Sequence, residues 1–90
     1  MYYNELKLLV LRILSGDGFI DSSGVAAKLG GTGVDLDVHA IRMALMRYYK
    51  QGLLRRQRKS GMYVYSLTER GVRRWRWLES TVGKDPSVPN

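Results

Sequence analysis

The chain has 90 residues and a formal net charge of +7, and 44% of its residues are hydrophobic and 26% charged. These values are typical of one folded soluble domain with a modest core. The absence of cysteine excludes a disulfide framework and a thiolate metal site. No apolar run reaches the roughly 18–20 residues of a membrane helix, and the apolar stretch at residues 8–11 lacks a signal-peptide cleavage site. We therefore expect a cytoplasmic protein.

The first predicted element is a helix over residues 2–14, which ends at Ser-Gly-Asp-Gly, residues 15–18. Its apolar positions recur with helical period on one face: Tyr2, Leu6, Leu9, Val10 and Ile13. Residues 19–21 are long enough only for a short strand. A second helix is expected to begin at a cap, Ser22 or Ser23, and to end at the glycine pair 30–31, before a loop over residues 32–36.

A third helix is expected to have Asp35 or Asp37 as its cap and to end at Gly52. At about 100° per residue, its apolar residues gather on one side: Val38, Ile41, Ala44, Leu45, Tyr48 and Tyr49. The opposite side carries His39, Met43, Met46, Arg47 and Lys50, with Arg42 on the flank. The helix is therefore amphipathic, and its polar side is cationic.

Two strands are predicted at residues 53–58 and 62–67, because both segments alternate, and residues 59–61 form the turn between them. Tyr63 and Tyr65 share strand parity with Leu67, so we expect them to point partly inward. A last helix is expected to begin at Thr68 as its cap and to run to about Glu79, with a core stripe of Val72, Trp75 and Leu78. The domain is thus predicted to cover residues 1–79, and residues 80–90 a flexible, polar tail.

The predicted order is helix, strand, helix, helix, strand, strand, helix, which is a mainly α fold with a small β-hairpin (α+β). Residues 40–54 contain a helix that ends in Gly-Leu, and residues 65–71 contain Leu-Thr-x-x-Gly before the closing helix. These two segments resemble the winged helix-turn-helix family of DNA-binding proteins, including regulators of the MarR and PadR types. The size and basicity are also similar to those of small archaeal winged-helix proteins that bind chromosomal DNA. The resemblance covers roughly residues 5–79, although residues 30–36 are longer than a compact helix-turn-helix connection.

Positive charge is concentrated in one part of the chain, and this predicts a polyanionic partner. Residues 39–79 carry eleven Lys or Arg against two Asp or Glu, whereas residues 1–38 carry three against five. We expect the third helix to lie in the major groove of DNA through His39, Arg42, Met43, Arg47 and Lys50, with the two arginines reading guanine. The resemblance implies that the hairpin is the wing, which would hold phosphates through Arg55, Arg56, Arg58 and Lys59. The predicted function is double-stranded DNA binding, as a transcriptional regulator or a nucleoid-associated, chromosome-organising protein.

The two terminal helices also predict a homodimer. Leu8 and Leu11 fall on the polar side of the first helix, and Trp77 falls among the arginines of the last. Large apolar groups exposed in this way indicate a self-association surface, and the resemblance implies dimerisation through terminal helices. The predicted interface comprises Tyr3, Leu8, Leu11, Trp75, Trp77 and Leu78. Alternatively, Trp77 packs against an arginine of its own chain.

Other interpretations of the same residues remain open. The basic hairpin could dock an acidic protein partner, because winged helices also serve in protein assembly, and RNA binding is a weaker option. No enzyme, cofactor or metal site is indicated: the glycines at residues 30–33 lack the Lys-Ser/Thr ending of a P-loop, and His39 is the only histidine. Nothing in the sequence identifies an effector ligand or a target DNA sequence.

Overall fold

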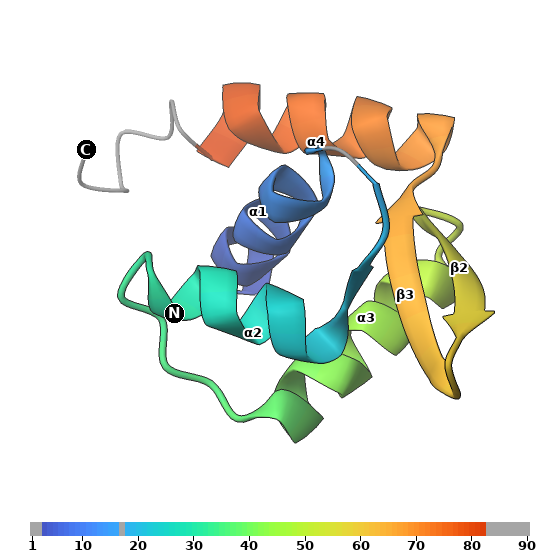
Figure 1. The fold of residues 1–90 in the computed structure, drawn as a ribbon. Coiled ribbons are helices and arrows are strands. Elements are labelled where there is room, and N and C mark those ends of the chain that lie inside the picture. The colour runs from blue at the N-terminus through green and yellow to red at the C-terminus, as the bar shows by residue number, and fades with distance from the viewer. Residues whose placement is uncertain (1–2, 17, 83–90) are drawn as a thin grey trace.

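Four helices and a three-stranded antiparallel sheet make up residues 3–16 and 18–82, the part of the chain that the computed structural model describes (Figure 1). In chain order the elements are α1 (Tyr3–Leu14), β1 (Ile20–Asp21), α2 (Ser22–Gly30), α3 (Val38–Lys50), β2 (Leu54–Lys59), β3 (Met62–Leu67) and α4 (Glu69–Val82). The predicted order of elements is therefore confirmed. Helix α4 runs beyond its predicted end into the predicted tail, and residues 83–90 of that tail lie outside the described residues.

The sheet ties the start of α2 to the hairpin. Its strand order is β1-β3-β2, and β3 pairs with β1 through Ile20 and Tyr65 and with β2 along its whole length. Asp21, the last residue of β1, caps α2 by accepting a hydrogen bond from the backbone N–H of Gly24 at 2.7 Å. The prediction that Ser22 or Ser23 caps this helix is therefore wrong. Asp21 is paired with Val64 in the sheet, so the cap of α2 comes one residue earlier than the helical pattern predicts.

Helix α1 is central to the core, because it packs against α2, α4 and β3 (Figure 1). A helix covered on several sides needs apolar residues on more than one face. The prediction that Leu8 and Leu11 are exposed is accordingly wrong, since their exposed fractions are 6% and 0%. Lys7 is also buried, and its Nζ donates a hydrogen bond to Gln51 Oε1 at 2.7 Å. The other fully buried large side chains are Val10, Leu14, Val25, Leu29, Ile41, Leu45, Tyr48 and Leu78.

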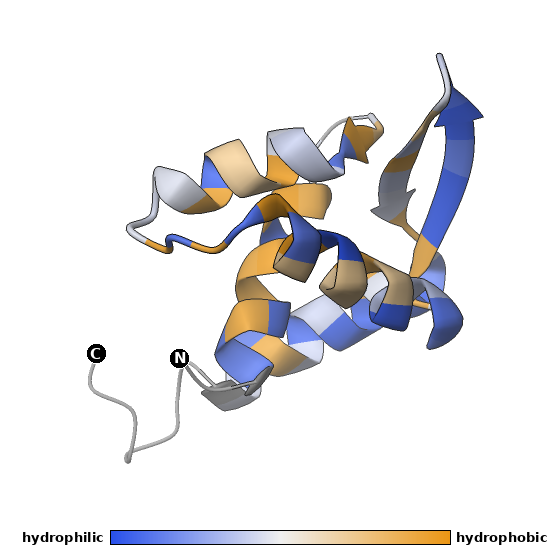
Figure 2. Ribbon diagram, turned by 90° about the horizontal axis from the view of Figure 1, so that it is seen from below, coloured by the Kyte–Doolittle hydropathy of each residue, from blue (hydrophilic) through white to orange (hydrophobic). Residues whose placement is uncertain are grey.

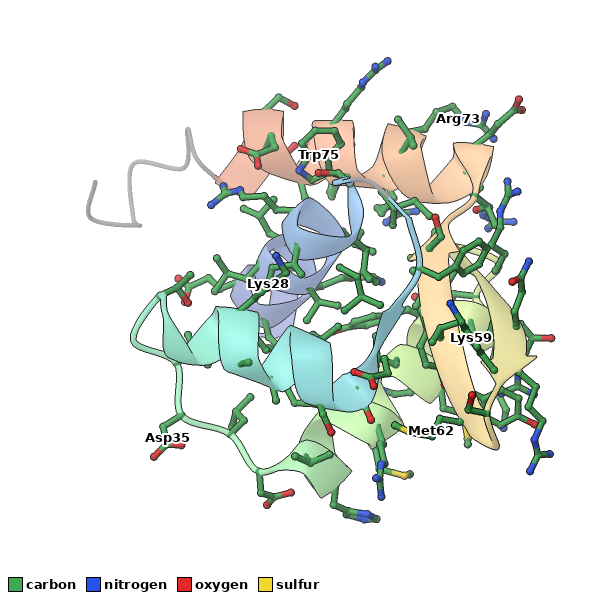
Figure 3. All side chains as sticks on the ribbon, viewed as in Figure 1. Lys28, Asp35, Lys59, Met62, Arg73 and Trp75 are labelled. Atoms are coloured by element: carbon green, nitrogen blue, oxygen red, sulfur yellow. The ribbon has the colours of Figure 1, made fainter. Side chains whose placement is uncertain are left out.

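Polar contacts join α1 to α4 at the edge of this core. Arg12 Nε donates to Glu79 Oε1 at 2.7 Å, and Trp75 Nε1 donates to the same oxygen at 3.0 Å. The hydrogen bond from Arg12 lowers the pKa of Glu79. Trp75 lies on the side of α4 that faces α1 (Figure 3), so this predicted dimer residue is engaged within its own chain. Leu78, also predicted at the dimer interface, is part of the core.

The start of α4 lies against the end of α3 at close range. Thr68 caps α4 as predicted: its Oγ1 accepts from the Gly71 N–H at 3.0 Å and donates to the Gly52 carbonyl at 2.7 Å. The Thr68 N–H donates to the Leu53 carbonyl oxygen at 3.0 Å. A Cβ atom at Gly71 would lie 2.0 Å from that same Leu53 oxygen. The Gly-Leu and Leu-Thr-x-x-Gly motifs therefore meet at one junction, which tolerates no side chain at residue 71.

We expect Gly71→Ala to destabilise the protein by about 1–3 kcal/mol, because the added methyl group must displace backbone rather than a flexible side chain. Chemical unfolding followed by circular dichroism measures the change. Gly30→Ala is the matched control, since a Cβ there meets nothing within 4 Å at the end of a helix. That control should raise stability slightly, by less than about 1 kcal/mol. Equal effects of the two substitutions would contradict the close approach.

Candidate nucleic-acid interface

Helix α3 presents one exposed face along its whole length. Asp37 caps the helix by accepting from the Ala40 N–H at 2.8 Å. The core side of α3 is buried through Ile41, Ala44, Leu45 and Tyr48. The opposite face carries all five side chains that the sequence predicted for this helix, each of them exposed: His39, Arg42, Met43, Arg47 and Lys50. Exposed Met46 lies among them.

The exposed residues of α3 differ in their distance from the hairpin. Arg42 lies on the hairpin side, where its Nε donates to Ser22 Oγ at 3.3 Å. Arg47 follows Arg42 by five residues, which is about 140° around the helix, and therefore lies on the far side of the face. Ser22 is the first residue of α2 and was not predicted as a site residue. Its role depends on the packing of α2 against α3, which local pattern does not reveal.

The hairpin formed by β2 and β3 divides its cations between two faces. Strand pairing puts Arg56 opposite Tyr65 and Arg58 opposite Tyr63, on the face that begins with buried Leu54. Arg55, Gln57 and Lys59 alternate with them and occupy the other face. Figure 2 shows the hairpin extending from the body of the molecule, with β2 hydrophilic over most of its length. The four predicted wing cations are therefore not equivalent.

Arg56 is held between two aromatic rings. Its guanidinium carbon lies 4.0 Å from the ring centroid of Tyr49 in α3 and 4.2 Å from that of Tyr63 in β3. Arg58 lies over Tyr63 at the longer distance of 5.5 Å. Planar stacking of this kind is a cation–π interaction that arginine makes better than lysine. Arg56 thus connects the hairpin to α3, a role that the sequence did not predict.

Tyr63 and Tyr65 both lie on the inner face of β3, as expected, but only Tyr65 is buried: their exposed fractions are 42% and 5%. Tyr49, predicted on the core side of α3, is 36% exposed. The cause is the same for Tyr49 and Tyr63: the hairpin extends past the core, so its inner face there meets arginine instead of apolar side chains.

A groove of about 250 Å³ separates α3 from the tip of the hairpin. The tip is a two-residue turn in which Ser60 and Gly61 both have positive φ, 52° and 79°. Arg42 and Met46 come from α3, and the other wall comes from the hairpin. The complete lining is Ser22, Arg42, Met46, Gly61, Met62, Tyr63 and Tyr65. Met62 lies at the hairpin edge of this groove (Figure 3). The groove joins the exposed helix face to the hairpin as one surface.

This surface carries an excess of exposed positive charge. No carboxylate in the described ranges forms an ion pair with Arg42, Arg47, Lys50, Arg55, Arg58 or Lys59. In the same ranges, no three His, Cys, Asp or Glu residues gather as metal ligands would. The described helices are also too short or too polar to span a bilayer.

We expect Arg56→Lys to lower the free energy of unfolding by about 1 kcal/mol, because lysine keeps the charge but loses the planar stack on two rings. Amide hydrogen exchange in β2 and β3 should also become faster. Arg58→Lys is the matched control on the same face, and it should change both quantities less. If the two variants behave alike, Arg56 does not connect the hairpin to α3.

Comparison with known proteins relates the chain to solved structures only: no protein-family model and no curated protein matches it. It is similar to a predicted DNA-binding transcriptional regulator from E. coli, with 22% identity and a TM-score of 0.66 over 84% of this chain and 73% of that one. It is also similar to Bacillus subtilis PadR, solved in complex with operator DNA, with 18% identity and a TM-score of 0.69. That match covers 94% of this chain and 52% of PadR, so the chain spans about half the length of PadR. These likenesses establish the fold, which is a winged helix-turn-helix, as predicted.

Proposed function

We propose that this chain binds double-stranded DNA, either as a transcriptional regulator or as a nucleoid-associated, chromosome-organising protein. The observation that carries the proposal is the groove, because it joins the cationic face of α3 to the basic hairpin. Duplex DNA has a phosphate backbone on each side of its major groove. A protein that binds it needs a helix for the major groove and, beside that helix, cations for the phosphates. Both similar structures are described as DNA-binding or DNA-bound, which agrees with this proposal.

The proposed arrangement places α3 in the major groove and the hairpin over the adjacent backbone. Arg42 shares the groove with the hairpin and already donates through Nε to Ser22, so its terminal nitrogens are placed for a phosphate. Arg47 lies farther from the hairpin and is the better candidate for reading guanine. Arg58 and Lys59 would contact phosphates, whereas Arg56 would act by holding the hairpin in position.

The rival interpretation, in which the basic hairpin docks an acidic protein, requires charge on the hairpin alone. The exposed cations of α3 fit duplex DNA better, because they extend the same surface across the groove. The homodimer stays a prediction. Leu8, Leu11 and Leu78 are buried in their own chain, and the side chain of Tyr3 lies outside the described residues. Trp77, at 50% exposure, is therefore the remaining apolar support for self-association.

Binding to a random duplex should depend steeply on salt. If the complex contains about 6–10 phosphate contacts, affinity should fall about 10³–10⁵-fold between roughly 50 and 200 mM salt, because bound cations of the DNA are released. Fluorescence anisotropy of a labelled duplex, titrated at several salt concentrations, measures the slope. A flat response would refute the electrostatic contribution and, with it, the proposed function.

Arg58→Ala and Arg47→Ala should affect binding differently. Arg58→Ala should weaken binding to all duplexes alike and reduce the salt slope by about one, as expected for one lost phosphate contact. Arg47→Ala should change the preference between sequences, by about 1–3 kcal/mol at the base it reads. Lys28→Ala is the charge-matched control, since Lys28 is exposed on α2 outside the groove. Equal losses on every sequence for Arg47→Ala would leave it no part in base reading.

A further inference from the structure

A second cationic surface lies on the outer side of α4. Arg70, Arg73, Arg74 and Trp77 line an open hollow of about 530 Å³ there, and we call this set the α4 stripe. Their spacing of three and four residues puts them on one helix face. The opposite face of α4 packs on the core through Leu78 and partly buried Trp75. Figure 3 shows Arg73 on the outer side of the helix, whereas Trp75 lies toward α1.

The arginines of the α4 stripe have no carboxylate partner among residues 3–16 and 18–82. The carboxylate of Glu79, on the same helix, is occupied by Arg12 and Trp75. Arg74 lies over the half-exposed ring of Trp77, with 5.4 Å between the guanidinium carbon and the ring centroid. This contact holds one guanidinium in place without neutralising it. Like charges three and four residues apart repel one another. An anion bound between the arginines would relieve this repulsion and so lower the free energy of the protein.

Most of the α4 stripe lies on the opposite side of the molecule from the exposed face of α3, but Arg70, at its start, lies near Gly52, just after the end of α3. In Figure 1, α4 runs along one side, α3 lies on the other, and α1 and α2 are between them. The contacts agree, because α4 packs on α1 and β3, and α3 packs on α2 and β2. A straight duplex in contact with the hairpin and the exposed face of α3 therefore does not reach Arg73, Arg74 and Trp77, which lie farther along α4. An anion that binds these three residues belongs to a second molecule.

We propose that the α4 stripe binds the phosphate backbone of a second DNA duplex, so that one chain bridges two duplexes. This rests on the proposed function, which supplies the first duplex. Arginine forks pair with phosphate oxygens in bidentate fashion, and closely spaced arginines match a chain of phosphates. A second copy of this chain would bring three more arginines to the same surface, whereas phosphates neutralise those already there, so DNA is the occupant that the charge favours. A chain that binds DNA on both sides would act as a chromosome-organising protein, whereas a regulator needs only one bound duplex.

The test is a bridging assay with the whole chain. A duplex immobilised on beads is saturated with protein, and capture of a second, fluorescent duplex is measured alongside ordinary binding to one duplex in solution. We expect the wild type to bridge. Arg73→Gln with Arg74→Gln should reduce capture by at least about tenfold, while binding to a single duplex stays within about twofold. Arg73→Lys with Arg74→Lys should restore capture, since the positive charge is retained.

The matched control for Arg74→Gln alone is Lys28→Gln, which removes one exposed cation of α2 outside the hollow. It should bridge as the wild type does. Undiminished capture by the Arg73 and Arg74 variant would overturn the proposal, and this includes the case in which two chains bridge through their α3 faces. A wild type that binds one duplex but captures no second one would also overturn it, and would leave the stripe to an acidic protein partner. If the wild type binds no single duplex at all, the proposed function itself is overturned instead.

Discussion

The close approach between the start of α4 and the end of α3 is the constraint on which the rest of the structure depends. Thr68 and Gly71 hold the first turn of α4 against the Leu53 carbonyl, and a glycine is required because any Cβ there would overlap the backbone. Gly52, at φ 79°, turns the chain out of α3 immediately before this contact. The direction of the hairpin and that of α4 are therefore both set relative to α3. This junction therefore determines where the groove and the α4 stripe lie relative to α3.

The hairpin itself has little core to hold it. Beyond Leu54, Tyr65 and Leu67, its inner face has no buried apolar side chain, and the stack of Arg56 between Tyr49 and Tyr63 takes the place of one. Such a contact is strong enough to orient a hairpin, yet weak compared with core packing. Its members are all at least partly exposed, so a bound polyanion could compete for the guanidinium. The stack of Arg56 sets the distance between the hairpin and α3, and therefore the width of the groove, which Tyr63 also lines.

The distribution of charge follows from this arrangement. The acidic half of the chain supplies α1 and α2, which contribute six of the fifteen buried hydrophobic residues in the described part of the chain, together with the caps Asp21 and Asp37. The basic half supplies the other nine, mainly from the inner sides of α3, the hairpin and α4, and it carries its cations on their outer sides (Figure 1). Cations on two opposite sides keep their mutual repulsion low, because screening at physiological salt acts over about 8 Å. The net charge of +9 on residues 39–79 is therefore spread over two surfaces.

Much of the fold could be predicted from the sequence, because helical and strand periods, Asp37 and Thr68 as caps, and glycines that end helices are local signals. The cationic face of α3 was predictable for the same reason, since a helical wheel needs no knowledge of neighbours. Burial is different: Leu8 and Leu11 look exposed on a wheel, but α1 is covered from several sides by elements distant in sequence. The stacking of Arg56, the contact of Arg42 with Ser22 and the groove between α3 and the hairpin likewise require packed elements. Local periodicity tells which side of an element is polar, and only tertiary packing decides what that side meets.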